Sequence, residues 1–234
     1  MDNVEARDHS GQCHEQDAKQ SLLEIMRPRT LSDLALPTRI TERLQRMIEK
    51  DSIMNMLFYG KIGTGKTSAA LQFDSGADRW IMRGSAHLFM QWDGLDLKNV
   101  DFVKKDMKRS LYSADLFLGD NFKICFIDRA DLIPEKAQQA IPSVMDDLSG
   151  HCRFIFAVNY PSKIIPEIRS RLMPVCFDIK PCEREEVQER LIDRYERKLA
   201  ENGIVPDKRR LAEIVAADYP DLRSITKKIE FELA

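Results

Sequence analysis

The sequence has no long hydrophobic run, no ordered cysteine pattern and no excess of charge of one sign. No apolar stretch in its 234 residues approaches the ~20 residues that span a bilayer, and the polar N-terminus has no signal-peptide region, so we expect no membrane contact and a reducing, cytoplasmic setting. The five cysteines lack CxxC spacing, which argues against a zinc site or a disulfide framework. The net charge of −2 excludes a basic footprint over the whole chain, so any contact with nucleic acid needs a local patch.

Short apolar runs alternate with helical patterns over most of the chain. Residues that are apolar in succession are typical of strands buried on both faces of a parallel sheet. We predict an α/β fold with a five-stranded parallel sheet between helices. The predicted strands are 54–59, 80–82, 122–127, 153–158 and 175–179, and the predicted helices between and before them are 31–50, 67–73, 100–116 and 135–148.

The character of the sequence changes near Pro181. Only helical patterns follow, over 185–202, 207–218 and 222–233. The first seventeen residues are polar and nearly free of large apolar groups, as in disordered tails. We therefore predict a disordered tail over 1–17, an α/β domain over 18–181 and a small all-helical domain over 182–234.

One segment fits the phosphate-binding loop pattern G-x4-G-K-(S/T), and it lies between a predicted strand and a predicted helix, as the pattern requires. Its glycines accept positive φ and let backbone amides turn towards one point. Lys66 would reach the β- and γ-phosphates of a nucleoside triphosphate, and Thr67 would hold Mg²⁺. The residues expected at the nucleotide are Gly60, Lys61, Ile62, Gly63, Thr64, Gly65, Lys66, Thr67 and Ser68.

The predicted strand 122–127 is followed by an acid, Asp128. In phosphate-loop proteins such an acid binds Mg²⁺, directly or through water. The next residue is Arg129, where many ATPases carry the glutamate that polarises the attacking water. Arginine has no acceptor and stays protonated, so it cannot serve as a general base. Asp131 and Glu135 are alternatives; otherwise hydrolysis is weakened or is completed by another chain.

Three more polar residues are candidates for the same site. Asn159 follows the strand 153–158, and its amide can position a water beside the γ-phosphate, because central parallel strands point their carboxyl ends at one crevice. The alternative for Asn159 is a turn-forming role before Tyr160. Arg171 can reach a phosphate on a neighbouring subunit, and Arg223 can close onto the γ-phosphate. On charge alone, both arginines are also explained as solvated surface residues.

Four segments resemble AAA+ sliding-clamp loader subunits of the replication factor C small-subunit and T-even phage kind. Residues 24–34, EIMRPRTLSDL, resemble the opening signature E-K-Y-R-P-x-T-x-x-D, and 137–140, AQQA, resemble A-Q-x-A-L. Residues 159–171, NYPSKIIPEIRSR, closely resemble C-N-Y-x-S-K-I-I-x-x-I-x-S-R-C, and 221–224, DLRS, resemble D-x-R-(K/R). The resemblance runs from about residue 22 to the C-terminus.

The resemblance implies a P-loop AAA+ fold followed by a helical lid, with ATP and Mg²⁺ as cofactors. It implies that Asn159 is the sensor-1 residue, Arg171 a trans-acting arginine finger and Arg223 the sensor-2 arginine. Arg27 and Pro28 would line the adenine pocket. The implied catalytic set is Lys66, Asp128, Asn159, Arg171 and Arg223.

The implied function is that of an ATP-binding subunit that helps to open a sliding clamp and load it onto primer–template DNA during replication. Its partners would be other clamp-loader subunits, identical or different, the clamp and the DNA. The location would be the cytoplasm, of the host if the protein is viral, or the nucleus if it is eukaryotic. Lys104 and Lys105 are the first candidates for DNA phosphates, and Lys108 and Arg109 follow; the alternative is an ordinary solvated basic face.

Two other functions stay open. One is a non-hydrolysing structural or regulatory subunit that lends Arg171 to a neighbour, and the other is a different AAA+ machine such as an initiator or helicase loader. Family members continue into a helical collar domain, whereas this chain ends after the lid, so we expect it to lack a collar. We also expect residues 86–99 to be an insertion that touches the clamp or DNA, or that packs on its own domain.

Overall fold

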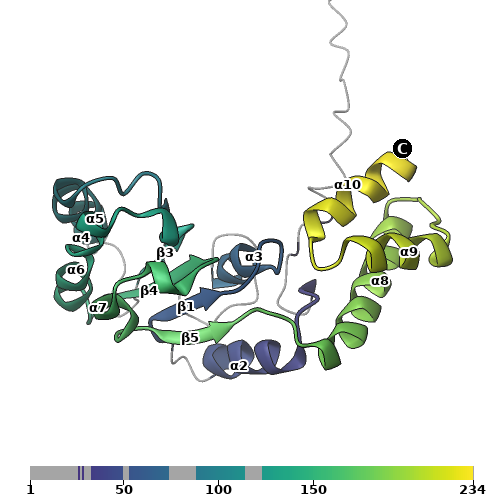
Figure 1. Cartoon of the computed structure of the whole chain (residues 1–234), viewed down its shortest axis with the longest axis horizontal. Helices are drawn as coiled ribbons and strands as arrows, with labels where there is room; N and C mark the ends of the chain where they lie inside the picture. The colour runs from purple at the N-terminus through teal and green to yellow at the C-terminus, as the bar shows by residue number, and fades with distance from the viewer. Residues whose placement is uncertain are drawn as a thin grey trace, which may run out of the picture.

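A computed structural model describes residues 26, 28, 33–49, 53–73, 88–113 and 123–233. Its centre is a five-stranded sheet in the order β2-β3-β4-β1-β5, and every neighbouring pair is parallel. Figure 1 shows the sheet with helices around it and a group of three helices beyond one end. The strands are β1 Met56–Tyr59, β2 Leu88–Asp93, β3 Lys123–Asp128, β4 Cys152–Val158 and β5 Met173–Cys176.

The sheet is buried on both faces, as the successive apolar residues predict. Alternate residues of a strand point to opposite faces, so Met56 and Phe58 join one core cluster while Leu57 joins the other. Helices α2 (Thr38–Glu49) and α3 (Lys66–Ala70) cover the first face. The second face is covered by α4 (Lys108–Ser113), α5 (Glu135–Gln138), α6 (Ile141–Asp147) and α7 (Pro166–Arg169).

The strand β2 corrects the prediction of an insertion at 86–99. Residues Leu88–Asp93 pair with β3 from end to end and form the edge of the sheet. Gln91 interrupts the apolar run because one face of an edge strand can stay exposed, and this hid the strand in the sequence. Trp92 packs edge-on against Phe102 at 5.8 Å between ring centroids, so this segment belongs to its own domain. The strand predicted at 80–82 lies outside the described residues.

Other boundaries shift by a few residues. The predicted strand 175–179 is Met173–Cys176, and the predicted helix 31–50 begins only at Thr38, after Pro37. The predicted helix 100–116 contains a π-helical stretch, Phe102–Met107, before α4. The strands predicted at 54–59, 122–127 and 153–158 correspond to β1, β3 and β4.

The three C-terminal helices are α8 (Arg184–Glu201), α9 (Lys208–Asp218) and α10 (Leu222–Leu233), each within one residue of its predicted start. They share a hydrophobic cluster of their own that includes Leu191, Val215 and Ile229. Met26 and Ala35 from the N-terminal part of the chain also pack into this cluster. The domain limits 18–181 and 182–234 stay predictions, and the tail 1–17 lies outside the described residues.

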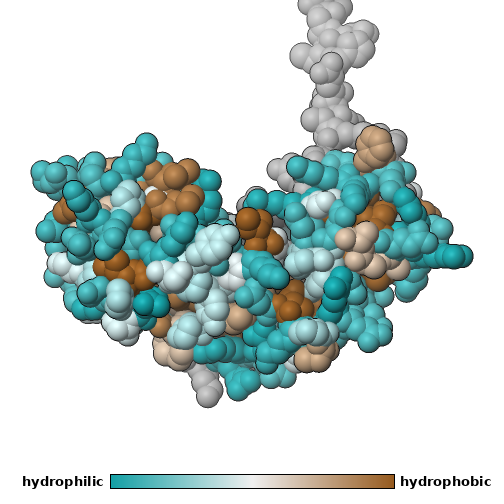
Figure 2. Space-filling view, in the orientation of Figure 1, coloured by the Kyte–Doolittle hydropathy of each residue, from teal (hydrophilic) through white to brown (hydrophobic). Residues whose placement is uncertain are grey.

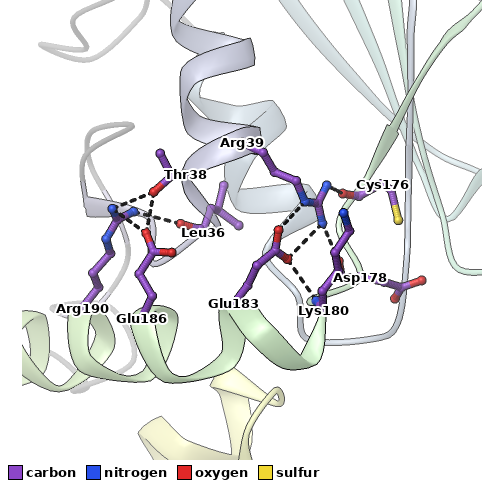
Figure 3. Close-up of polar contacts among 9 residues, drawn as sticks. All are labelled: Leu36, Thr38, Arg39, Cys176, Asp178, Lys180, Glu183, Glu186 and Arg190. Carbon is purple, nitrogen blue, oxygen red and sulfur yellow. Dashed lines mark hydrogen bonds and ion pairs between the residues drawn. The ribbon is translucent and has the colours of Figure 1, made fainter.

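Arg39 connects the sheet to the first of these helices (Figure 3). Its guanidinium donates to the Cys176 carbonyl at 2.8 Å and to the Asp178 carbonyl at 2.6 Å, just beyond β5. The same group forms an ion pair with Glu183 at 2.7 Å, at the N-terminal end of α8. The Arg39 side chain therefore connects α2 to the segment between β5 and α8.

A second set of bonds lies one turn further along α8 (Figure 3). Arg190 donates to the hydroxyl of Thr38 at 2.8 Å and to the carbonyl of Leu36 at 3.2 Å. Glu186 accepts a bond from the Thr38 hydroxyl and pairs with Arg190 at 2.8 Å. The start of α2 is thus bound to α8 by a network of Thr38, Glu186 and Arg190.

Candidate functional site

The phosphate loop follows β1 and turns through three glycines. Gly60, Gly63 and Gly65 have φ values of 147°, 84° and 87°, which residues with a Cβ rarely adopt. A Cβ on Gly63 would lie 2.9 Å from the Cα of Asp221, so the loop also touches the turn before α10. The backbone between 60 and 65 is therefore shaped by glycine at each bend. Lys61 and Ile62 are exposed at its tip.

Lys66 lies inside this loop and is 8% exposed. Its Nζ donates to the carbonyls of Gly60 and Lys61, both at 2.8 Å, and to Oδ1 of Asn159 at 3.0 Å. Burial lowers the pKa of the ammonium, and the charges of Asp128, Asp131 and Asp178 act against that effect. The ammonium is thus held at the centre of the loop, where a bound phosphate would replace carbonyl partners.

Thr67 and Asp128 meet across the site. The Thr67 hydroxyl donates to Oδ2 of Asp128 at 3.0 Å, which joins the start of α3 to the end of β3. A hydroxyl and a carboxylate are the hard oxygen donors that Mg²⁺ prefers, and this ion usually takes its other ligands from water and phosphates. These two oxygens are therefore of the kind that Mg²⁺ would use together with water and phosphate oxygens; the described residues hold no cluster of three or more His, Cys, Asp or Glu side chains.

Asn159 is brought to the same place by β4, which pairs with β1. The site is therefore built at the ends of three adjacent parallel strands. Asp128 ends β3, Asn159 follows β4, and Lys66 and Thr67 begin the helix after the loop that follows β1. The sequence located all four, because each one directly follows a predicted strand or belongs to the loop pattern.

The Arg129 side chain pairs with an acid outside this group. Its guanidinium forms an ion pair with Asp93 on the neighbouring strand β2, with Nε at 3.0 Å from Oδ2. Its backbone is in the left-handed region, with φ 51°, and its amide donates to Oδ1 of Asp128 at 2.9 Å. Asp93 and Asp128 are register partners, so two acids and one arginine lie side by side at the ends of β2 and β3.

The ion pair shifts the pKa values of both Asp93 and Arg129. Burial would raise the pKa of Asp93, but the hydrogen bonds from Arg129 and from the Leu95 amide outweigh it and the pKa is lowered. The hydrogen bond to Asp93 raises the pKa of Arg129. Both groups are therefore charged at neutral pH. Sequence reasoning missed Asp93 because it falls in the stretch interpreted as an insertion; an apolar run ending in an acid was the available signal.

The alternative acids lie in different surroundings. Asp131 is 7% exposed, and its Oδ1 is buried with no hydrogen-bond partner among the described residues. Its charge acts on Lys66. Glu135, in contrast, is exposed at the start of α5. The structure thus distinguishes a buried acid near the loop from a surface acid.

Asp178 is a further residue that the sequence did not reveal. It follows β5, and its Oδ1 accepts a hydrogen bond from the Lys61 amide at 2.8 Å. A Cβ on Gly60 would lie 2.9 Å from the Asp178 backbone nitrogen. Asp178 therefore fixes the start of the loop, and the contact joins residues 117 positions apart, which no local pattern reports.

Arg171 lies at the end of α7 and is not brought to the loop of its own chain. Its guanidinium makes two bonds to the Asp146 carboxylate on α6, both at 2.8 Å, and a third to the Glu167 carbonyl at 2.7 Å. The hydrogen bond from Arg171 lowers the pKa of Asp146. Within its own chain, Arg171 is therefore engaged with α6 and α7.

A cavity of about 420 Å³ opens between α3 and the C-terminal helices. Pro28, which is predicted to line an adenine pocket, lines this cavity, whereas Arg27 lies outside the described residues. Arg223 lines it from the first turn of α10. Figure 2 shows the molecule hollowed between its sheet side and its helical side. The full lining is Met26, Pro28, Leu34, Ala35, Leu36, Gly65, Thr67, Ser68, Leu71, Arg194, Tyr195, Leu222, Arg223 and Thr226.

The residues predicted for DNA lie on the π-helical stretch and α4. Lys104, Lys105 and Arg109 are exposed, and Lys105 is 3.5 Å from Asp101 in a surface ion pair. Lys108 instead pairs with Asp147 on α6. Lys104, Lys105 and Arg109 are therefore exposed to solvent, and Lys108 is partly exposed; Lys105 and Lys108 each have an acid partner.

The sequence profile of one protein family matches residues 56–178, which is more than half of the chain. That family is described as the ATPase family associated with various cellular activities (AAA). The chain belongs to the AAA family. The matched range runs from β1 to just beyond β5, so it contains the phosphate loop and the strand ends around it.

Curated relatives of this AAA protein are replication factor C small subunits. The protein from Methanococcus maripaludis strain S2 is 36% identical over 174 residues, which cover 73% of this chain and 52% of the relative. The Archaeoglobus fulgidus protein is 33% identical over 187 residues, covering 78% and 56%. The chain thus spans about half the length of the curated relatives it matches.

Solved structures with the same fold include more distant proteins. Thermotoga maritima RuvB T158V has a TM-score of 0.64 at 16% identity, over 88% of this chain and 64% of that one. AMPPCP-bound DnaA from Aquifex aeolicus has a TM-score of 0.61 at 18% identity, over 87% and 64%. At such identities the likeness shows the fold. Within the described part of the chain, no helix has both the length and the apolar character needed to cross a membrane.

Proposed function

We propose that this AAA protein is an ATP-binding clamp-loader subunit that helps to open a sliding clamp and place it on primer–template DNA. The observation that carries the proposal is the 36% identity to a replication factor C small subunit over 174 residues. The proposed partners are other clamp-loader subunits, the clamp and the DNA. Lys104, Lys105 and Arg109 are the proposed phosphate contacts because they are exposed.

The proposed roles at the nucleotide follow from the contacts. Lys66 would exchange the carbonyls of Gly60 and Lys61 for phosphate oxygens, which are stronger acceptors because they are charged. Thr67 and Asp128 would hold Mg²⁺, which neutralises charge on the phosphates when bound. Asn159, once Lys66 turns to the phosphates, would have its amide free to position a water.

The two arginines would act from different sides. Arg223 lines the cavity of its own chain and would close onto the γ-phosphate from α10. Arg171 would serve a neighbouring subunit, where an arginine finger stabilises charge in the transition state. Its bidentate contact with Asp146 holds the guanidinium at the surface until a neighbour offers phosphate.

A second function is favoured by Arg129. Arg129 stands where the water-activating glutamate is usually found, and its guanidinium, which pairs with Asp93, has no acceptor for a water. This supports a subunit that binds ATP, hydrolyses it weakly or not at all, and lends Arg171 to a neighbour. If hydrolysis does occur in this chain, we propose the Asp131 carboxylate as the general base, because its side chain is buried, its charge acts on Lys66 and one of its oxygens has no partner among the described residues.

Measurement of ATP hydrolysis separates these functions. The chain is assayed alone, then with a sliding clamp and primed DNA from the same source, and ATP affinity is measured in parallel. Turnover stimulated by clamp and DNA supports the catalytic clamp-loader subunit. ATP binding without turnover in any mixture supports the structural subunit. A chain that binds no ATP would contradict both.

A further inference from the structure

Asp93 and Arg129 form an ion pair at the ends of β2 and β3, one strand away from the acid proposed for Mg²⁺. Nε of Arg129 lies 3.0 Å from Oδ2 of Asp93, and a terminal nitrogen of the same guanidinium also donates to that oxygen. The other oxygen, Oδ1, accepts a hydrogen bond from the Leu95 amide at 2.9 Å. Both carboxylate oxygens of Asp93 are therefore bonded, which holds its side chain in one orientation.

The backbone brings Arg129 close to a second acid. Asp128 precedes it in the chain and is the register partner of Asp93, and neighbouring strands lie only about 4.8 Å apart. The Arg129 amide donates to Oδ1 of Asp128 at 2.9 Å, and the Gly94 amide donates to the Asp128 carbonyl at 2.8 Å. These bonds fix the two strand ends together, so the long Arg129 side chain has two carboxylates within its reach.

Three acids surround Arg129 and compete for its guanidinium. The hydrogen bond and charge of Asp93 raise the pKa of Arg129 most, and the charges of Asp128 and of the exposed Asp96 raise it further. The Arg129 side chain is half exposed, so the bonds to Asp93, rather than packing, determine where the guanidinium lies. Without the Asp93 carboxylate, the guanidinium would turn to Asp128 or to Asp96.

We propose that Asp93 is a positioning residue that keeps the Arg129 guanidinium off Asp128 and so leaves the Asp128 carboxylate to Mg²⁺. A guanidinium on that carboxylate would repel the ion and take up lone pairs already shared with Thr67 and the Arg129 amide. Paired with Asp93, the same guanidinium has its charge neutralised one strand away. The inference rests on the proposed nucleotide function and adds to it a requirement for an acid at the end of β2.

The test measures how the affinity for a fluorescent ATP analogue depends on Mg²⁺, from EDTA to saturating ion. We expect Asp93→Asn to raise the Mg²⁺ concentration at half-maximal effect about tenfold, the size of one charge-assisted hydrogen bond that competes with the ion. Adding Arg129→Gln to Asp93→Asn should bring that concentration back to within about twofold of the unchanged protein. Asp96→Asn is the control for charge alone, and since Asp96 is exposed and screened it should also stay within about twofold.

Two results would overturn the inference. If Asp93→Asn leaves the Mg²⁺ requirement unchanged, Arg129 does not move onto Asp128. If the double variant keeps the loss, or if Asp93→Asn weakens binding equally in EDTA, the effect does not pass through Arg129. Melting without nucleotide reports folding, and Asp93→Ser, which keeps an acceptor for the Leu95 amide, takes the place of Asp93→Asn if that variant does not fold. The proposed function fails separately, if the unchanged protein binds no ATP analogue at any Mg²⁺ concentration.

Discussion

Arg129 occupies a backbone conformation that costs free energy for a residue with a Cβ. Its φ is 51°. Its carbonyl oxygen approaches Gly94 so closely that a Cβ there would lie 2.2 Å away, so this approach requires glycine at position 94. The Gly94 amide also donates to the Asp128 carbonyl at 2.8 Å. The turn after β3 and the end of β2 are therefore fixed together, and the ion pair of Arg129 with Asp93 is part of that arrangement.

The first prediction concerns hydrolysis. We expect Arg129→Glu to raise ATP turnover at least tenfold in the assembled complex, because the substitution supplies an acceptor for the attacking water, and a positioned general base contributes about 10²–10⁴-fold. Arg129→Ala is the control, since it removes the cation without adding a base. Steady-state phosphate release measures both. Equal rates for the two variants would show that the cation, and not a missing base, restrains the reaction.

The second prediction concerns Gly63. Gly63→Ala combines a strained φ of 84° with a clash against the turn at Asp221, whereas Gly203→Ala has a similar φ of 75° and open space around it. We expect the φ strain to cost both variants about 1 kcal/mol in free energy of unfolding, and Gly63→Ala to lose more and to bind ATP more weakly. Urea unfolding and ATP titration check this. Identical losses would mean that the clash is relieved by movement of the turn.

Residues of the site differ in how visible they are in the sequence. Gly60–Thr67, Asp128 and Asn159 could be predicted, because a loop pattern or a strand end is a local signal. Asp178 could not, because its place in the site comes from a contact with Lys61, more than a hundred positions away. Asp93 was missed for a different reason: the polar Gln91 interrupts the apolar run of the strand that Asp93 ends.

Among the elements, helices were easier to predict than the edge of the sheet. The helices α8, α9 and α10 show a sustained apolar stripe, so their starts were predicted within one residue. Helices cover both faces of the central strands, so the residues on both faces are apolar and the strands are easy to recognise. The edge strand β2 gives a weaker signal, because the exposed Gln91 interrupts its apolar run.

The junction between α2 and α8 gives the third prediction. Arg39→Ala removes bonds to two carbonyls and to Glu183, and we expect it to lower the free energy of unfolding by about 1–3 kcal/mol. Arg46→Ala on the same helix breaks only an exposed pair with Glu42 and should change stability by less than about 0.5 kcal/mol. Urea denaturation compares them. Equal effects would show that the junction contributes no more than a surface contact.

The fourth prediction is the pH dependence of that junction. Burial would raise the pKa of Glu183, but the hydrogen bonds from Arg39 and the Lys180 amide lower it overall. A carboxylate with a lowered folded pKa stabilises the protein above its unfolded pKa, about 4.3, and loses that stabilisation as pH falls through the folded value. The loss caused by Arg39→Ala should therefore be full at pH 7 and smaller at pH 3.5. A loss that is constant with pH would assign the effect to the carbonyl bonds alone.

At the scale of the whole molecule, the proposed finger and the phosphate loop are on different parts of one domain. Arg171 rests on Asp146 of α6, while Lys66 lies under the loop after β1. A complete site would therefore combine the loop of one chain with the arginine of the next.

The fifth prediction is complementation between two inactive variants. Lys66→Ala should abolish ATP binding in its own chain, and Arg171→Ala should leave binding intact but lower turnover of the assembled complex about 10³-fold. Mixing the two should restore activity, because some sites then pair an intact loop with an intact arginine. Phosphate release from the mixture is the measurement. No recovery from mixtures that still assemble would place Arg171 outside the reaction.

The close approach of Gly63 to the turn at Asp221 couples two parts of the molecule. The loop that would hold the phosphates is also the surface against which the start of α10 rests, at a distance that leaves no room for even a methyl group. A shift of the loop would therefore displace this turn, and a shift of the turn would displace the loop. The coupling runs from backbone to backbone, so it does not depend on the identity of any side chain at either place.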